Sequence, residues 1–281
     1  MERWRGILFG VLAAGFLAGP AWALDIQPTG DAQTLANAIV GKSGVVIKSV
    51  KYTGSAQASG TYTAGPLGLA DGSIFTSGKA TTALPPNNQT NAGDSWNLPG
   101  DPLCTALAGG IGTFDAARLE IVFTLPVGAS GIRFDYAVGS EEYPEWVGEI
   151  NDVAGIFVDG VNKALDKEGN AITINGPFFS GQSVITDSGT QYDGTTPRLQ
   201  AQVAMDPGDH TMIIIVCDAL DDILDTGIFV AGLGVCLGNC DSVAWCGDGK
   251  KDPGEDCDDG NNKDGDGCDN TCKLEAVCGD P

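Results

Sequence analysis

The strongest constraint on the fold of this chain lies at residues 246–272, CGDGKKDPGEDCDDGNNKDGDGCDNTC, where four cysteines enclose a loop rich in Asp, Asn and Gly. A segment with so few apolar residues cannot fold by burying a core, so covalent or metal cross-links must order it. The sequence therefore predicts a small stapled module around Cys246, Cys257, Cys268 and Cys272. Four cysteines allow three disulfide pairings, and the sequence leaves all three open.

The amino-terminal residues have the pattern of a secretory signal peptide. Arg3 and Arg5 precede an apolar run at residues 7–18, and an A-x-A cleavage site follows at Ala21-Trp22-Ala23. A retained membrane anchor is the alternative, but the apolar run is too short for a comfortable span. We therefore expect residues 1–23 to be removed. The product is an exported protein, secreted or held at the cell surface, with no membrane insertion after signal cleavage.

The charge of the chain limits its partners. It carries 37 acidic and 15 basic residues, which gives a formal net charge of -22. Such a field repels nucleic acid and anionic lipid and attracts cations, so nucleic-acid partners are excluded and divalent metal is the natural counter-charge. The alternative is that the acidity only keeps an exported protein soluble.

The nine cysteines of an exported chain indicate disulfides rather than catalytic thiols. Four belong to the tail module, and four lie upstream: Cys104, Cys217, Cys236 and Cys240. The ninth opens Cys278-Gly279-Asp280, which copies Cys246-Gly247-Asp248. Either a second repeat begins at residue 278, or Cys278 closes the first.

Residues 24–237 are long enough for one sizeable domain, and nearly all their signals are strand signals. One helix is predicted at Ala32–Val40, with Asp31 as its N-cap and Gly41 as its terminator. We predict strands at Val45–Tyr52, Ser73–Thr76, Arg118–Leu125, Ile132–Val138, Val153–Val158, Ala171–Ile174, Leu199–Val203, Thr211–Cys217 and Gly227–Ala231.

Several of these strands alternate between apolar and polar residues. Leu119, Ile121 and Phe123 share one face, and Glu120 and Thr124 lie on the other. Short strands between Gly, Asn and Asp turns predict an all-β fold, an antiparallel sandwich or jelly roll with one short N-terminal helix. A small disulfide-rich module follows at residues 238–281, and residues 78–112 form a long loop.

Residues 134–160 carry three short motifs in a recognisable order: Ser140-Glu141-Glu142-Tyr143, Asn151-Asp152 and Ile156-Phe157-Val158. With DAQTLANAIVG at residues 31–41 and DALDDILDTGIFVAG at residues 218–232, they resemble the choice-of-anchor L domain of bacterial surface and secreted proteins. The tail resembles the myxobacterial-type cysteine-rich repeat. The first resemblance implies an extracellular domain of poorly defined activity, joined in different members to different attachment devices.

The tail has the donor pattern of half a calcium loop. Asn262, Asp264 and Asp266 place oxygen ligands at alternate positions, followed by the turn glycine Gly267. Position 12 falls on Lys273, where an EF-hand needs a bidentate Glu, so this is not an EF-hand. We predict a disulfide-framed Ca²⁺ site, and the alternative is that these residues only form tight turns. Its expected ligands are Asp258, Asp259, Asn262, Asp264 and Asp266.

A second candidate metal site lies in the sandwich. One predicted strand end carries Glu141, Glu142, Glu145 and Asp152, and another carries Asp218, Asp221, Asp222 and Asp225. If these ends meet, their charges repel unless a cation or protons neutralise them. We predict a Ca²⁺ site there, and separately solvated loops are the alternative. The expected ligands are Glu141, Glu142, Asp152, Asp218 and Asp222.

Catalytic signals are weaker. The single histidine, His210, fits a turn-edge residue better than a triad base, and no G-x-S-x-G or H-E-x-x-H motif occurs. Paired carboxylates such as Glu142 and Asp152 could serve a glycosidase as its acid and its nucleophile or base, although acidic pairs are also common in metal-binding loops. Trp96, Tyr143 and Trp146 stand beside polar residues, a mixture suited to stacking on sugar rings, although capping the core is the alternative.

These observations favour a non-enzymatic, exported surface or matrix protein with Ca²⁺ as cofactor. Its expected partner is extracellular polysaccharide or a cell-surface protein. The alternatives are a carbohydrate-active hydrolase that uses paired carboxylates and a purely structural spacer in a surface array.

Overall fold

The computed structural model describes residues 24–40, 44–166, 168–181, 183–252 and 255–275. The predicted signal peptide, the helix terminator Gly41 and Cys278 lie outside these ranges. None of the described helices is long and apolar enough to span a membrane.

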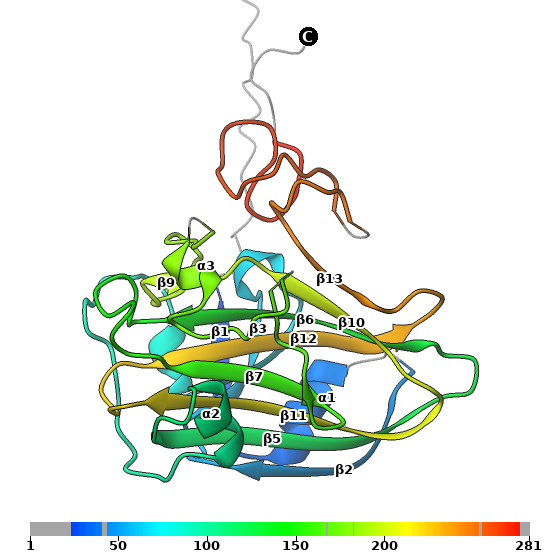
Figure 1. Cartoon of the computed structure of the whole chain (residues 1–281), viewed down its shortest axis with the longest axis horizontal. Helices are drawn as coiled ribbons and strands as arrows, with labels where there is room; N and C mark the ends of the chain where they lie inside the picture. Colours follow the sequence, from blue (N-terminus) through cyan, green and yellow to red (C-terminus); the bar gives the residue numbers. More distant parts are fainter. Residues whose placement is uncertain (1–23, 41–43, 167, 182, 253–254, 276–281) are drawn as a thin grey trace, which may run out of the picture.

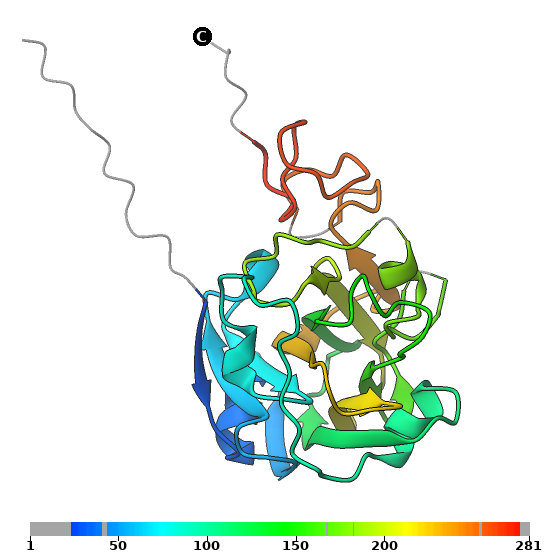
Figure 2. The same cartoon turned by 90° about the vertical axis from the view of Figure 1, so that its left-hand side faces the viewer.

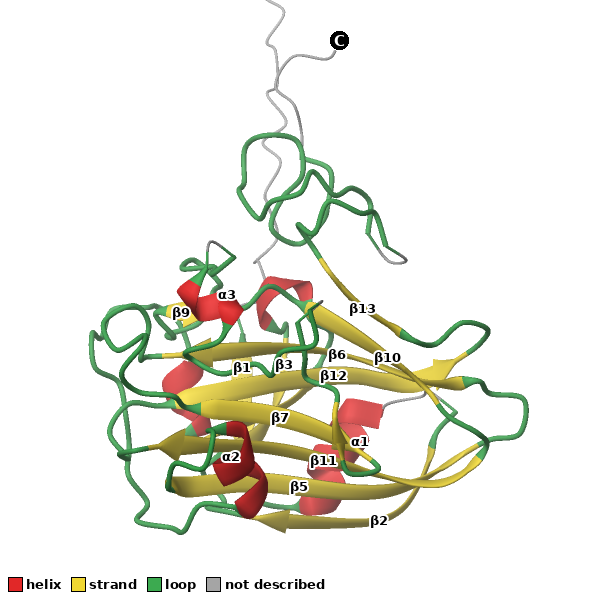
Figure 3. Ribbon diagram, in the orientation of Figure 1, coloured by secondary structure: helices red, strands yellow, loops and turns green. Residues whose placement is uncertain are grey.

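The described strands form two antiparallel sheets (Figure 1). The larger sheet has the order β1 (Asp25–Pro28), β3 (Ser59–Thr63), β4 (Gly72–Thr76), β12 (Thr226–Cys236), β6 (Gly131–Ser140), β10 (Leu199–Ala204) and β13 (Ser242–Trp245), and β9 (Gly194–Thr195) pairs with β6. The smaller sheet has the order β2 (Val46–Thr53), β5 (Thr113–Leu125), β11 (Gly208–Ala219), β7 (Val153–Val158) and β8 (Val161–Asn162). The predicted all-β fold is confirmed (Figure 3).

The core lies between the two sheets because the central strands alternate as predicted. Leu119, Ile121 and Phe123 of β5 are fully buried. On the neighbouring strand β11, Ile214 lies opposite Leu119 and Met212 lies opposite Ile121, and both are also fully buried. One face of each strand therefore enters the core, as a period of two residues requires.

The predicted helix is confirmed as α1 (Ala32–Val40). Its first turn is capped by Asp31, whose Oδ1 accepts a hydrogen bond from the Thr34 backbone N–H at 2.8 Å. Leu35 and Ile39, one turn apart, are buried against the core.

Several features differ from the predictions. Residues 171–174 form no strand, because Ala171 and Thr173 make single bridges to two different partners, Leu165 and Val153. The predicted loop at residues 78–112 contains the short helices η2 (Ala80–Ala83) and α2 (Pro102–Leu107). The edge strand β1 and its neighbour β3, with sequences DIQP and SGTYT, carry too little apolar alternation to be predicted.

Helix α2 covers the outer face of the smaller sheet, and the disulfide Cys104–Cys217 ties it to β11. Beneath it Val153, Phe157 and Ile215 form a second apolar cluster. The smaller sheet is therefore buried on both faces near β7 and β11.

The tail joins the sandwich through a strand. β13 pairs antiparallel with β10, so residues 242–245 of the predicted module extend the larger sheet. Trp245 of β13 packs edge-on against Phe178, with ring centroids 5.5 Å apart. Beyond it the cysteine-rich segment lies on one side of the sandwich (Figures 1 and 2). Its disulfides are nested, and a third closes the short loop before β13: Cys246–Cys272, Cys257–Cys268 and Cys236–Cys240.

Candidate functional site

Acidic side chains gather at the end of the sandwich where β6 and β11 finish and β7 and β12 begin. Ser140 at the end of β6 lies opposite Thr226 at the start of β12. Val153 at the start of β7 lies opposite Cys217 near the end of β11. Five carboxyl residues beside these positions, each at most 2% exposed, are here named the acidic cluster: Glu141, Glu142, Asp152, Asp218 and Asp225.

Hydrogen bonds tie the acidic cluster across both sheets. Asp152, just before β7 of the smaller sheet, accepts at Oδ2 from the Thr226 hydroxyl of the larger sheet at 2.9 Å. Its Oδ1 accepts from the Ala219 backbone N–H, also at 2.9 Å. The backbone N–H of Glu141 donates to the carbonyl oxygen of Asp225 at 3.1 Å. The two acidic strand ends therefore meet at one end of the fold, as the second metal-site hypothesis requires.

Several buried oxygens of the acidic cluster have no hydrogen-bond partner among the described residues. They are Glu141 Oε1, Glu142 Oε2, both carboxyl oxygens of Asp218, and Asp225 Oδ2. Buried polar atoms are normally hydrogen-bonded, and a buried carboxylate without a donor or a cation is costly. In the described part of the chain, none of the ion pairs reaches these five residues.

The acidic cluster holds its protons more tightly than free carboxyl groups do. Burial raises the pKa of Glu141 to about 8, and burial together with the nearby Asp152 raises the pKa of Glu142 to about 8. Burial raises the pKa of Asp225 to about 8 and that of Asp152 to about 7. The pKa of Asp218 is well above its usual range because of burial and the charge of Asp152. At neutral pH this site therefore favours either bound protons or a bound cation.

The acidic cluster differs from the predicted ligand set at one position. Asp222 is only half-buried, and its Oδ2 accepts a hydrogen bond from the Ser95 hydroxyl outside the cluster. Asp225 takes its place, because it directly precedes β12, whose first residue pairs with the end of β6. The four other predicted residues do come together. The sequence placed Asp225 in the right acidic run but did not show which member of the run would be buried.

The carboxyl oxygens of the acidic cluster do not lie close enough together to coordinate one ion by themselves. Within the described residues, one group of three His, Cys, Asp or Glu side chains has ligand atoms within 4.8 Å of one another, and it consists of Glu255, Asp258 and Cys272. Cys272 is bonded to Cys246, so that group lacks a thiolate ligand. A cation in the acidic cluster would need backbone carbonyls and water in its coordination shell as well.

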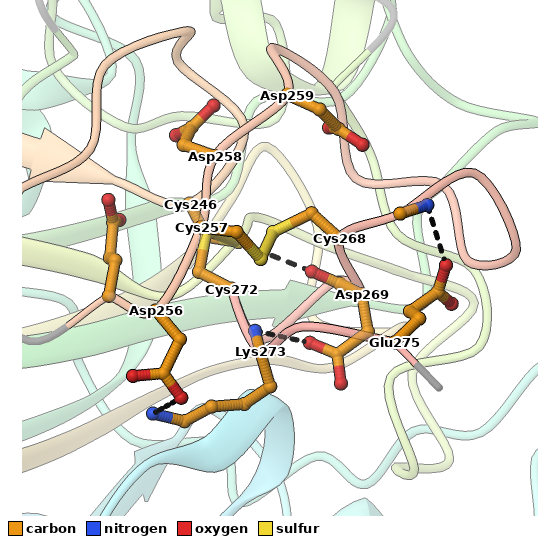
Figure 4. Close-up of a disulfide and its surroundings, with 12 residues drawn as sticks. Cys246, Asp256, Cys257, Asp258, Asp259, Cys268, Asp269, Cys272, Lys273 and Glu275 are labelled. Carbon is orange, nitrogen blue, oxygen red and sulfur yellow. Dashed lines mark hydrogen bonds and ion pairs between the residues drawn. A yellow bond between two sulfur atoms is a disulfide. The ribbon is translucent and has the colours of Figure 1, made fainter. Parts of the chain in front are cut away.

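The predicted tail ligands are mostly engaged in turns. The carboxylate of Asp258 accepts backbone N–H donors from Gly247, Asp248, Gly249 and Gly260 at 2.8–3.1 Å. Figure 4 shows acidic side chains spread around the disulfide rather than gathered at one point. The contacts of Asp258 match the turn alternative, and the tail metal site stays a prediction.

Three of the other predicted tail ligands line one open hollow of about 550 Å³: Asn262, Asp264 and Asp266. Asp264 accepts from the Asn270 backbone N–H at 2.9 Å, and the side chains of Asp259 and Asp266 both accept from the Asn261 amide. All three Asp residues are exposed. Asn262 has a buried Oδ1 with no partner among the described residues.

A pocket of about 310 Å³ opens beside the acidic cluster. Glu142 belongs to both, and Trp146, which is 42% exposed, contributes an aromatic wall. The lining comes from three connections between strands and comprises Asn91, Glu142, Trp146, Ile150, Asp221, Ile223 and Leu224.

Of the three aromatic residues proposed for sugar stacking, Trp146 alone lines this pocket. Tyr143 packs against Phe179, with ring centroids 6.3 Å apart. The Trp96 indole N–H donates to the Gly78 carbonyl at 3.1 Å. Tyr143 and Trp96 are partly buried and pack against the core, which is the alternative role considered for them.

The histidine takes no part in this site. His210 lies near the start of β11, whereas Asp218 lies near its end. Its Nδ1 is 2.7 Å from Asp159 Oδ2, and its Nε2 is 2.8 Å from the Asp206 carbonyl oxygen. His210 is therefore a turn-edge residue, as expected from the sequence.

Comparison with known families matches residues 25–176 to the Choice-of-anchor L domain. No curated protein matches the chain. Among solved structures, the crystal structure of a carbohydrate-binding module specific for non-crystalline cellulose, CBM28, is similar at 13% identity over 75% of this chain and 98% of that chain. Its TM-score of 0.31 is too low to support any conclusion about ligands. The tail's resemblance to a cysteine-rich repeat has no family match to confirm it. Because the family match covers more than half of the chain, this protein belongs to the Choice-of-anchor L domain family.

Proposed function

We propose that this protein is an exported, non-catalytic surface or matrix protein that binds an extracellular ligand and is stabilised by Ca²⁺ at the acidic cluster. The observation that carries the proposal is the burial of five carboxyl groups at the strand ends beside the pocket, four of which have at least one oxygen without a partner among the described residues. The partner is extracellular polysaccharide or a cell-surface protein. Four disulfides support a location outside the cytosol, because disulfides persist in oxidising compartments.

Calcium suits the chemistry of the acidic cluster. Ca²⁺ is a hard cation that takes six to eight oxygen ligands in flexible geometry. It would supply positive charge to carboxyl groups that no ion pair of the described residues reaches, and the remaining ligands would be backbone carbonyls and water. Since the carboxylates are not preassembled, we expect a Kd of about 10⁻⁴ to 10⁻³ M, as in extracellular calcium modules.

Calcium would act by joining the two sheets at one end. The acidic cluster draws residues from the ends of β6 and β11 and from the approaches to β7 and β12. Neutralising these carboxyl groups removes the repulsion between strand ends of the larger sheet and strand ends of the smaller sheet. It would also fix Glu142, and with it the connection that carries Trp146.

Thermal unfolding of the mature chain in EDTA and in Ca²⁺ tests this proposal. At a calcium concentration of about 100 Kd, binding adds about 2.7 kcal/mol of stability. For a chain of this size that corresponds to an increase in Tm of about 5–10 °C. Asp218→Asn should abolish the increase, and the control Asp222→Asn should retain it. Equal Tm values in EDTA and Ca²⁺ would refute the calcium proposal.

Glycoside hydrolysis is the second candidate, and one observation favours it. Glu142 lines the pocket, and its pKa of about 8 suits a proton donor at neutral pH. Its proposed partner Asp152 is less suited, because both its oxygens accept hydrogen bonds and it does not line the pocket. Glycan hydrolysis that is lost in Glu142→Gln and Asp152→Asn would establish an enzyme. Its absence in the wild type favours the binding role.

A further inference from the structure

The pocket beside the acidic cluster has the size of a site for one small ring. Its volume of about 310 Å³ lies at the lower end of the range for ligand pockets, about 300–1,000 Å³. Residues 141–152 join β6 to β7, and residues 220–225 join β11 to β12, so both flank the acidic cluster. Asn91 comes from the long connection before α2. Each of the two connections that supply most of the pocket lining, residues 141–152 and 220–225, is therefore held at both ends by a packed strand.

The apolar part of the pocket offers an aromatic surface and an aliphatic floor. Trp146 is 42% exposed, so part of its indole ring is open to a ligand. Ile150 and Leu224 are buried, whereas Ile223 is 64% exposed. An indole face and aliphatic side chains suit the C–H face of a pyranose ring, which is apolar and flat on the scale of an aromatic ring.

The polar part of the pocket consists of hydrogen-bonding groups without positive charge. The lining includes the carboxyl groups of Glu142 and Asp221 and the amide of Asn91, and no Lys, Arg or His of the described residues belongs to it. Glu142 Oε2 is buried and has no donor among the described residues, so a ligand hydroxyl would complete its hydrogen bonding. A phosphorylated, sulfated or uronic-acid ligand would find no cationic side chain among these lining residues to pair with its charge.

An organic cation fits this lining less well than a sugar. An ammonium group could lie over Trp146 and face the two carboxylates. It would also lose water against Ile150, Ile223 and Leu224, which offer it no hydrogen bond. A sugar presents both kinds of surface at once, with C–H groups for the apolar wall and hydroxyl donors for the carboxyl groups.

We propose that this pocket binds one pyranose ring of a neutral saccharide, with the ring against Trp146 and its hydroxyls donating to Glu142 and Asp221. The proposal rests on the ligand-binding half of the proposed function and shares one residue, Glu142, with the calcium half. It makes Trp146 the anchor of the site and Asp221 a determinant of its selectivity.

Calorimetric titration of the mature protein with neutral cello-, xylo-, manno- and galacto-oligosaccharides tests the site. We expect one class of oligosaccharide to bind, and Trp146→Ala to weaken it about tenfold or more, the effect of losing a hot-spot aromatic residue. Asp221→Ala, on a different connection, should weaken it as well. Phe114→Ala is the matched control, because Phe114 is an aromatic residue of similar exposure, 40%, that does not line the pocket.

The outcomes separate the two proposals. If none of these oligosaccharides binds, or if binding survives both Trp146→Ala and Asp221→Ala, the saccharide site is refuted. If a lysine-rich peptide binds and Trp146→Ala abolishes its binding, the pocket is a cation site and the saccharide proposal fails. A Tm increase in Ca²⁺ without saccharide binding refutes this inference alone. Saccharide binding without a Tm increase refutes only the calcium half of the proposed function.

Discussion

The two acidic regions of this protein use the same residue type in opposite ways. In the sandwich, Asp218 is 1% exposed and neither of its carboxyl oxygens has a partner among the described residues. In the cysteine-rich tail, the carboxylate of Asp258 accepts four backbone N–H groups. An Asp whose carboxylate already accepts several backbone hydrogen bonds organises a turn. A buried Asp whose carboxylate accepts none requires a proton or a cation. The density of acidic residues is higher in the tail, but the demand for a cation is greater in the sandwich.

The largest expected difference between the two regions is in their response to pH without calcium. The pKa values of Glu141, Glu142 and Asp225 are about 8 in the folded state, far above those of exposed carboxyls. Their protonated forms therefore stabilise the fold below the unfolded pKa of about 4. This stability is lost as pH rises through about 8, because the folded state must then bury charge.

Denaturant unfolding in EDTA at pH 5 and pH 8 measures this response. We expect the sandwich to lose several kcal/mol between the two values, and Ca²⁺ to restore most of the loss at pH 8. Stability that is unchanged, or that rises with pH in EDTA, would contradict the burial of these groups.

Removing a disulfide of the tail should destabilise the tail and leave the calcium response of the sandwich unchanged. Replacing Cys246 and Cys272 by Ser opens a loop with a sequence separation of 26 residues. The tail should lose about 3–4 kcal/mol and become sensitive to protease. Limited proteolysis followed by mass spectrometry should show cleavage within residues 246–272, while the Tm increase of the sandwich in Ca²⁺ is unchanged. Loss of the calcium response in this variant would place the metal in the tail.

A substitution at the tail aspartate tests its structural role. Asp258→Ala leaves four backbone N–H groups without their acceptor. We expect the tail to lose about 1–3 kcal/mol, the cost of unsatisfied donors in a partly buried site. Hydrogen exchange at Gly247 and Gly249 should quicken. If exchange is unchanged in the variant, the carboxylate does not hold this turn.

The smallest effect is expected for an ordinary charged pair away from the acidic cluster. Burial lowers the pKa of His210, but its hydrogen bonds to Asp159 and Asp206 outweigh burial and raise the pKa above the usual value. The protonated pair therefore contributes below about pH 6.5 and is lost as pH rises through the folded pKa. Because Asp159 is half exposed, we expect less than about 1 kcal/mol. Comparing Asp159→Asn with the wild type at pH 5.5 and pH 8.5 checks this, and a difference that grows with pH would contradict it.

The sequence predicted the elements whose signal is local. Alternation in β5 and the capped helix α1 depend on neighbouring residues, and the exact bounds of β7 follow from one apolar run. The sequence does not predict β13, because its four residues form a strand only by pairing with β10. The sequence does not decide the disulfide pairing either, since spacing along the chain does not show which cysteines meet.

The acidic cluster was predicted in outline because strand ends are visible in sequence. The sequence does not show that Asp225 joins the cluster in place of Asp222, because this depends on which residue directly precedes β12. The sequence also does not show the role of Asp115. It is 1% exposed, and its carboxylate holds the backbone N–H groups of Trp96 and Leu98, which attaches the long connection to β5. No local pattern marks such a contact.

Calcium calorimetry on three forms of the mature chain tests the central claim most directly. The acidic cluster, rather than the cysteine-rich tail, should bind the ion. Saturable Ca²⁺ binding should therefore appear in the wild type, persist in Asp258→Ala and disappear in Asp218→Asn. Binding that survives Asp218→Asn and is lost in Asp258→Ala would contradict the account.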